Sequence, residues 1–103
     1  DLQWAELMRR EARARLDYLL PPGTVLCLPT TPFPVPKKGL PLSDQNRIRN
    51  QILCLCAHGG LTGTPQISIP GAAAEGIPVG LSIIGARNTD ASLVAVANAM
   101  ENL

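Results

Sequence analysis

The sequence predicts an α/β protein whose elements follow the order helix, strand, helix, strand, strand, helix. Two segments, residues 2–20 and 43–58, repeat apolar side chains at the three- and four-residue spacing of a helix with one buried face. Between and after them lie aliphatic runs bounded by proline and glycine, which is typical of strands. A third helical pattern begins at residue 90, so helices and strands are interspersed along the chain.

Length and composition limit the classes of protein to which this chain can belong. The chain has 103 residues, a net charge of +1, and 46% hydrophobic but only 3% aromatic residues. This is one domain or less, and so few aromatic side chains favour a piece of a larger domain. The balanced charge argues against nucleic acid or a membrane as partner. No apolar run approaches the ~18 residues of a membrane span, and no signal peptide is evident, so we expect a cytoplasmic protein.

The first helix is expected over residues 2–20, with an apolar stripe and a charged opposite face. The stripe repeats every four residues and is widened by two leucines: Trp4, Met8, Ala12, Leu16, Leu20, Leu7 and Leu19. On the other face two glutamates each precede an arginine by four residues, which favours ion pairs on a solvated surface rather than a basic binding patch. Two prolines and a glycine, residues 21–23, end the helix.

A strand buried on both faces is expected at residues 24–28, because this continuous apolar run is bounded by helix breakers. The following residues, 29–39, contain four prolines, which exclude a helix and predict a stiff, extended loop. Prolines beside Lys37 and Lys38 would also suit a ligand of an SH3-type domain. Such ligands usually lie in polar disordered segments, however, whereas this segment directly follows a core strand.

The second helix has Ser43 as its expected N-cap and Gly59 and Gly60 as its expected end. Cys54 and Cys56 are two residues apart and project in different directions, so we interpret them as buried, reduced, small apolar residues. His58 lies four residues after Cys54, which keeps a cysteine hydrolase as an alternative, although a terminal histidine also satisfies helix carbonyls. The ligand spacing of a zinc site is lacking, and no metal is expected.

Two neighbouring strands are expected at residues 66–71 and 77–85, joined by a loop of small residues, 72–76. Polar and apolar residues alternate in both strands, so their apolar sides can face one layer of helices. Gly80 lies inside the second strand and indicates a close approach to the backbone there.

Thr89 and Asp90 can cap the final helix. Its predicted core-facing stripe is Leu93, Val96, Ala97 and Met100. The glycines at residues 59–63 follow a helix and lack the lysine of a phosphate-binding loop, and no dinucleotide-binding motif is present. No nucleotide or other organic cofactor is therefore expected.

Several of these blocks, taken in order, resemble the C-terminal segment of the amidase signature enzymes. The matching residues are 57–71, 76–85 and the helix that Asp90 begins, and residues 28–32 are similar to the strand and loop before that segment in the family. Each block alone is a common mixture of glycine, proline and aliphatic residues. Their order and spacing together are specific.

The resemblance implies a large α/β/α domain around a mixed sheet that hydrolyses carboxylic amides to an acid and ammonia or an amine. In this family a lysine deprotonates a bridging serine, which activates a nucleophilic serine. The nucleophile forms an acyl-enzyme that water then releases. The relay is needed because a serine hydroxyl is too weakly acidic to attack an amide unaided.

The chain departs from the family pattern at the catalytic residues. It lacks the glycine- and serine-rich stretch of the family, and its four serines stand alone. Lys37 and Lys38 are the only lysines, and we interpret them as solvated loop residues. No catalytic position carries over, so residues 1–103 are expected to be the C-terminal part of an amidase domain and inactive alone.

Besides the cysteine hydrolase, two hypotheses about function remain open. In the first, the partner is the remainder of an amidase domain with a small-molecule amide substrate, and Thr30 and Phe33 are candidate substrate contacts on the proline-rich loop. It predicts an uncovered apolar surface around Leu26, Ile67 and Ile83. In the second, the chain is a small self-standing binding or structural protein descended from an amidase, whose sheet edges are protected by self-association or another partner.

Overall fold

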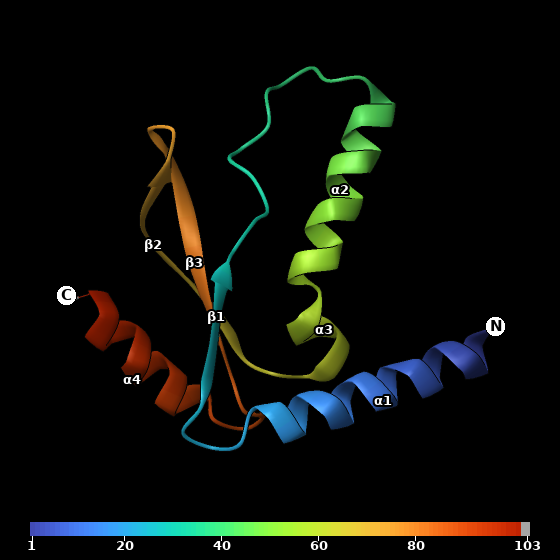
Figure 1. Ribbon diagram of the computed structural model, residues 1–103, viewed down its shortest axis with the longest axis vertical. Coiled ribbons are helices and arrows are strands. Elements are labelled where there is room, and N and C mark those ends of the chain that lie inside the picture. The colour runs from blue at the N-terminus through green and yellow to red at the C-terminus, as the bar shows by residue number, and fades with distance from the viewer. Residues whose placement is uncertain (102–103) are drawn as a thin grey trace.

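The computed structural model describes residues 1–101 as helices interspersed with strands (Figure 1). In chain order the elements are α1 (Leu2–Leu19), β1 (Val25–Pro29), α2 (Leu42–Cys56), α3 (His58–Thr62), β2 (Gln66–Ala74), β3 (Ile77–Gly85) and α4 (Asp90–Glu101). The predicted α/β class and element order are confirmed, with the short helix α3 as an addition. In the described part of the chain, no helix is long and apolar enough to cross a membrane.

The three strands of the described residues form one antiparallel sheet in the order β1-β3-β2. β3 is central, pairing with β1 from Val25↔Gly85 to Pro29↔Leu81 and with β2 from Gln66↔Ile84 to Ala74↔Ile77. The expected pairing of the last two strands is therefore confirmed. The resemblance implies a mixed sheet for the complete domain, not for these three strands alone.

The connection between β2 and β3 differs from the prediction. Residues 72–74, expected in a loop, belong to β2, and a two-residue turn, Glu75 and Gly76, joins the strands. Both turn residues have positive φ, 54° and 78°, as in a type I′ turn. Such a turn matches the twist of paired strands, so the ladder continues up to it. Pro70 and Gly71, which a regular strand disfavours, lie in a bulge between Ile69 and Ala72.

The core lies between α4 and one face of the sheet. Its buried members come from β2, β3 and α4: Ile69, Ile83, Leu93 and Ala97, packed against the partly buried Ile67, Val96 and Met100. This confirms the predicted stripe of the last helix. The expectation that Ile83 is uncovered is wrong, because α4 covers this side chain and it is 0% exposed. Leu26, by contrast, is 41% exposed.

The apolar stripe of α1 is covered only in part. Met8, Ala12 and Leu16 are half-buried and Leu20 is buried, where the helix contacts α3. Other predicted members of the stripe, Trp4, Leu7 and Leu19, are 63%, 59% and 64% exposed. Figure 1 shows the reason for Trp4 and Leu7, since the N-terminal part of α1 extends away from the rest of the molecule, whereas Leu19 is exposed at the other end of the helix.

The burial predicted for the first strand is also wrong for the described residues. Val25 and Leu26 are 38% and 41% exposed, and Cys27 is exposed as well. β1 is an edge strand, and α4 packs on β2 and β3 instead. The continuous apolar run therefore has no covering layer within residues 1–101.

The bounds of α2 are shifted from the prediction. The helix begins at Leu42 with Pro41 at the N-cap position and no side-chain cap, so Ser43 is not the N-cap. It ends at Cys56, and the chain re-forms one helical turn, α3, over the two glycines that are expected to stop it. Gly63 ends α3 in the left-handed conformation, with φ of 76°.

The overall shape is flat and open. The radius of gyration is 15.7 Å and the extents are 46 × 41 × 16 Å. A compact domain of this length has a radius of gyration of about 13 Å. Figure 1 shows α1 and α2 extending away from the sheet in different directions, whereas α4 packs on it.

Candidate functional site

Thr30 directly follows β1 and is held by the central strand and by α2. Its backbone N–H donates to the carbonyl oxygen of Gly80 at 2.9 Å, which extends the β1–β3 pairing by one residue. Its carbonyl oxygen accepts a hydrogen bond from the Sγ of Cys56 at 2.6 Å. The start of the proline-rich loop is thus anchored on two sides.

The side chain of Thr30 joins two serines from the neighbouring strands. Its Oγ1 lies 2.7 Å from Oγ of Ser68 and 2.8 Å from Oγ of Ser82. Ser68 and Ser82 are directly paired across β2 and β3. Ser82 is 0% exposed, whereas Ser68 is exposed. We call these three residues the hydroxyl cluster.

Gly80 makes room for the hydroxyl cluster. A Cβ atom at this position would lie 2.5 Å from Oγ of Ser68 and 2.7 Å from Oγ1 of Thr30. Both separations are shorter than contacts of real Cβ atoms. The predicted close approach to the Gly80 backbone is confirmed, and the approaching groups are these two side chains.

Phe33, the other candidate substrate contact, lies against α2. It is half-buried and lines an open groove of about 740 Å³ between the proline-rich loop and α2, together with Asn46, Asn50 and Cys54. The hydroxyl of Thr31 donates to its carbonyl oxygen at 2.9 Å, which fixes the loop locally. Thr30 is not among the lining residues, so the structure does not bring the two candidates into one groove. Their contact with substrate stays a prediction.

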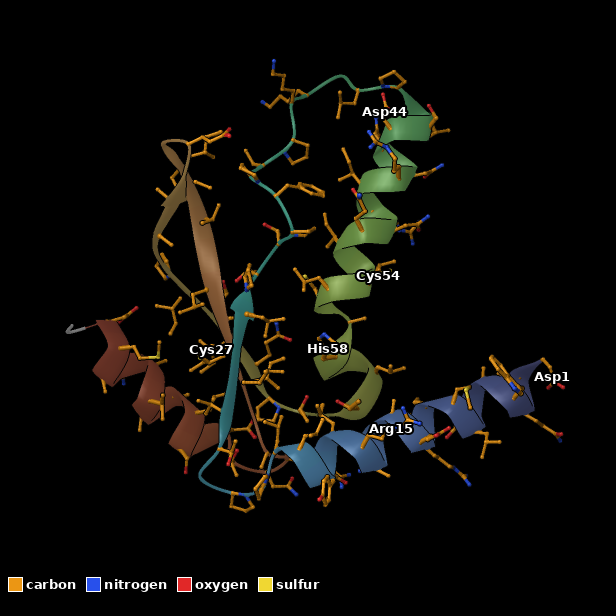
Figure 2. All side chains as sticks on the ribbon, in the orientation of Figure 1. Asp1, Arg15, Cys27, Asp44, Cys54 and His58 are labelled. Atoms are coloured by element: carbon orange, nitrogen blue, oxygen red, sulfur yellow. The ribbon has the colours of Figure 1, made fainter. Side chains whose placement is uncertain are left out.

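Cys27, Cys54 and His58 lie on three different elements, β1, α2 and α3 (Figure 2). Cys54 belongs to α2 and His58 begins α3, so the four-residue helical spacing expected between them is interrupted at Ala57. Cys54 is exposed and Cys56 is half-buried, which corrects the prediction that both are buried. Within residues 1–101, no group of three His, Cys, Asp or Glu side chains could hold a metal ion.

Charged groups lie away from the hydroxyl cluster. Lys37 and Lys38 are exposed and border a second groove between the proline-rich loop and α2. On α1, hydrogen bonding from Arg9 and the charges of Arg9 and Arg10 lower the pKa of Glu6 below its ordinary value. In the described part of the chain, the cluster makes no hydrogen bond to a charged side chain.

One ion pair connects distant parts of the chain. Nε and Nη2 of Arg87 donate to the two carboxylate oxygens of Asp17, at 3.0 and 2.5 Å. Asp17 lies near the end of α1 and Arg87 follows β3, so this pair holds α1 to the sheet. The sequence pattern predicts only the pairs within α1.

The sequence pattern also does not single out Ser68 and Ser82 as parts of a site. Two signals point to them: their alternation with isoleucines, which places them on one face of the sheet, and the glycine two residues before Ser82. The meeting with Thr30 depends on strand pairing between residues 38 and 52 positions apart.

Comparison with known proteins identifies the family. A model of the Amidase family matches residues 1–94. Amidase 1 from Oryza sativa subsp. japonica is 32% identical over 91 residues, covering 88% of this chain and 21% of that protein. The enantioselective amidase of Rhodococcus rhodochrous is 34% identical over 97 residues, covering 90% of this chain and 19% of that protein.

A solved structure shows the same fold over most of the chain. It is the crystal structure of one subunit of the glutamyl-tRNA(Gln) amidotransferase from Thermotoga maritima, with a TM-score of 0.71 and 27% identity. The match covers 90% of this chain and 20% of that protein. The chain thus spans about a fifth of the length of the rice amidase and of the Thermotoga protein. On the family match over residues 1–94, the chain belongs to the amidase family.

Proposed function

We propose that residues 1–103 form the C-terminal part of an amidase domain and that the complete domain hydrolyses carboxylic amides to an acid and ammonia or an amine. The family match supports this proposal, as do relatives that are named amidases. The partner of this chain is then the remainder of that domain, and the substrate is a small-molecule amide. We place this domain in the cytoplasm, in line with three free thiols.

The observation that carries the proposal is the uncovered apolar surface of an open fold. β1 presents Val25 and Leu26 on the outer edge of the sheet, and α1 presents Trp4, Leu7 and Leu19. Burying apolar area is worth about 25 cal/mol per Å², so these side chains favour a covering partner. The rest of an α/β/α domain would provide a neighbouring strand and a helical layer.

The chemistry in this proposal comes from residues outside this chain. A serine attacks an amide only when a neighbouring base removes its proton. Within residues 1–101 the side-chain partner of the Ser68 and Ser82 hydroxyls is Thr30, and Lys37 and Lys38 lie on the exposed loop. A Ser-Ser-Lys triad in the remainder would form and release the acyl-enzyme, while this chain shapes the substrate cleft.

Complementation tests the proposal. Rice Amidase 1 is prepared without the segment that this chain matches, and its hydrolysis of a simple carboxylic amide is measured with and without residues 1–103. We expect neither part to hydrolyse the amide and the mixture to do so. Leu26→Lys in this chain should prevent activation, because it places a charge on the proposed interface. The matched control is Ser92→Lys, at an exposed polar position on α4.

The alternative, a self-standing binding or structural protein, gives a different result. It predicts a folded dimer of residues 1–103 with a concentration-dependent, cooperative unfolding transition and no activation of the truncated amidase. That combination of results would contradict the proposal. Amide hydrolysis by the chain alone would contradict it as well, and alkylation of the thiols would then test the cysteine mechanism.

A further inference from the structure

We propose that the second groove, which Lys37 and Lys38 border, is filled in the complete amidase domain by an apolar segment of the remainder that is flanked by Asp or Glu residues. This inference rests on the proposed function and names the chemistry of the surface that meets this groove. Two observations carry it: an apolar lining that the described chain leaves uncovered, and three basic side chains without an acidic partner there. We call this groove the basic groove.

The basic groove lies between the end of the proline-rich loop, residues 36–40, and one side of α2 (Figure 1). Its volume is about 520 Å³. Nε2 of Gln45, in the first turn of α2, donates to the carbonyl oxygen of Leu40 at 2.7 Å, which ties the loop to the helix. Both walls of the groove are therefore held in place by residues 1–101 themselves. The apolar residues of its lining are Pro36, Leu40, Ile48, Ile52 and Leu53.

α2 requires more packing than this chain provides. No side chain of the helix is fully buried, and the sheet is covered mainly by α4 instead. Ile48 and Ile52 are half-buried against the groove, and Leu53 is 50% exposed. A helix of 15 residues is marginally stable by itself in water, so its stability depends on packing of its apolar face. This favours a cover that is present whenever the domain is folded, such as the remainder, over a ligand that comes and goes.

The charges around the basic groove all have one sign. Lys37, Lys38 and Arg49 border it, and its lining contains no Asp or Glu. Within residues 1–101 none of these three side chains forms an ion pair. Asp44, the acidic residue of α2, already pairs with Arg47, at 3.6 Å. The whole chain has a net charge of only +1, so the groove carries a local excess of positive charge.

The unpaired charges determine the chemistry of the covering segment. A segment that covers the groove takes the basic side chains partly out of water, which costs free energy unless they gain an acidic partner. Carboxylates on either side of an apolar stretch supply that partner while the stretch packs on the apolar lining. Charge complementarity of this kind also fixes the register in which two surfaces dock.

The test is zero-length cross-linking of the intact polypeptide that carries residues 1–103 in its source. A carbodiimide joins an amine to a carboxylate as an amide only where the two groups are in contact, and peptide mapping then identifies both residues. We expect Lys37 and Lys38 to be joined to Asp or Glu residues that lie outside residues 1–103 and flank apolar side chains. Links at other lysines of the same sample show that the reagent has reacted.

A conservative substitution tests the third basic residue. Arg49→Lys retains the positive charge and adds an amine at the groove, so it should gain a link to the segment that Lys37 and Lys38 reach. The matched control is Arg13→Lys, because Arg13 is also exposed on a helix and forms no ion pair among residues 1–101. It lies on α1, away from the groove lining, and should gain no link to that segment.

The possible failures are distinguishable. Unlinked Lys37 and Lys38 in a polypeptide much heavier than 10.9 kDa that hydrolyses an amide would overturn the inference and leave the proposed function intact. Links of these lysines only to residues 1–103, within one chain or between copies, would overturn it as well, as would links to acidic residues without apolar neighbours. A source polypeptide of 10.9 kDa that hydrolyses no amide would overturn both the proposed function and this inference.

Discussion

Gly80 lies in the central strand where the side chains of Thr30 and Ser68 cross over it. Two strands flank this position, so a larger residue cannot move away without displacing one of them. Protein interiors are packed to the density of organic crystals, and an added methyl group forces neighbouring atoms to shift. The same glycine would weaken a strand elsewhere, but here it lets three hydroxyls meet.

Gly80→Ala should therefore destabilise the chain by about 1–3 kcal/mol, the usual cost of overpacking. Gly60→Ala is the matched control, since a Cβ at Gly60 meets nothing within 4 Å and alanine is a better helix former than glycine. Urea unfolding followed by circular dichroism measures both changes. Equal stability of Gly80→Ala and the unchanged chain would show that the cluster tolerates a side chain there.

For single residues, the sequence predicts that some group approaches the backbone of Gly80 closely. It does not predict which residues do so. The glycine is a local signal, whereas its partners arrive through strand pairing. A bulge between Ile69 and Ala72 shifts the register of β2, and such irregularities cannot be located from alternation alone. The resemblance is enough to nominate the loop residues Thr30 and Phe33, but their separation into different surroundings follows only from the fold.

The hairpin of β2 and β3 contains a turn whose backbone conformation its sequence does not favour. Its turn places Glu75 at φ of 54°, a conformation that costs most L-amino acids energy and suits asparagine or glycine. The small residues before the turn are predicted as loop, because alanine and glycine are weak strand formers. Tertiary pairing with β3 overrides that preference.

Glu75→Asn should stabilise the chain by about 0.5–1 kcal/mol, because asparagine followed by glycine is the preferred pair of a type I′ turn. Asn88 already occupies a position of φ 64° after β3, so Asn88→Glu is the converse control and should destabilise by a similar amount. Thermal unfolding midpoints of the two variants should move in opposite directions. A lower midpoint for Glu75→Asn would contradict the assigned turn.

The ion pair of Asp17 and Arg87 connects elements that the sequence leaves unrelated. A double-mutant cycle with Asp17→Asn and Arg87→Gln should give a coupling of about 0.5–1 kcal/mol that decreases with salt. The side chains of Arg87 and Asp17 are 29% and 40% exposed, whereas those of Arg15 and Glu11 are 76% and 47% exposed. The pair within α1 should accordingly couple by only about 0.3–0.5 kcal/mol. Equal coupling of the two pairs would mean that Arg87 does not hold α1.

Element types are predictable because periodicity and helix breakers are local properties. The burial of those elements is not, since it depends on what lies beside them. β1 has the composition of a strand covered on both faces, yet Val25 and Leu26 are exposed. In the same way, Trp4 and Leu7 extend a stripe that α3 covers only toward the other end of α1.

At the scale of the whole molecule, these mismatches have one explanation. The apolar residues expected inside but found outside lie on α1 and β1, together with Cys54 on α2, whereas α4 and the β2–β3 hairpin form a small closed core. The fold is only 16 Å thick, and its one compact part is the core of α4, β2 and β3. Such a shape is expected of a section of a larger domain. The match to about a fifth of the solved Thermotoga protein supports this interpretation.

The central claim is that this chain is part of a larger amidase domain, and the intact mass of the polypeptide that carries it in its source tests this most directly. Mass spectrometry should find a polypeptide several times heavier than the 10.9 kDa of these residues, containing two serines and a lysine of the amidase triad. A stable polypeptide of 10.9 kDa with this sequence alone would contradict the claim.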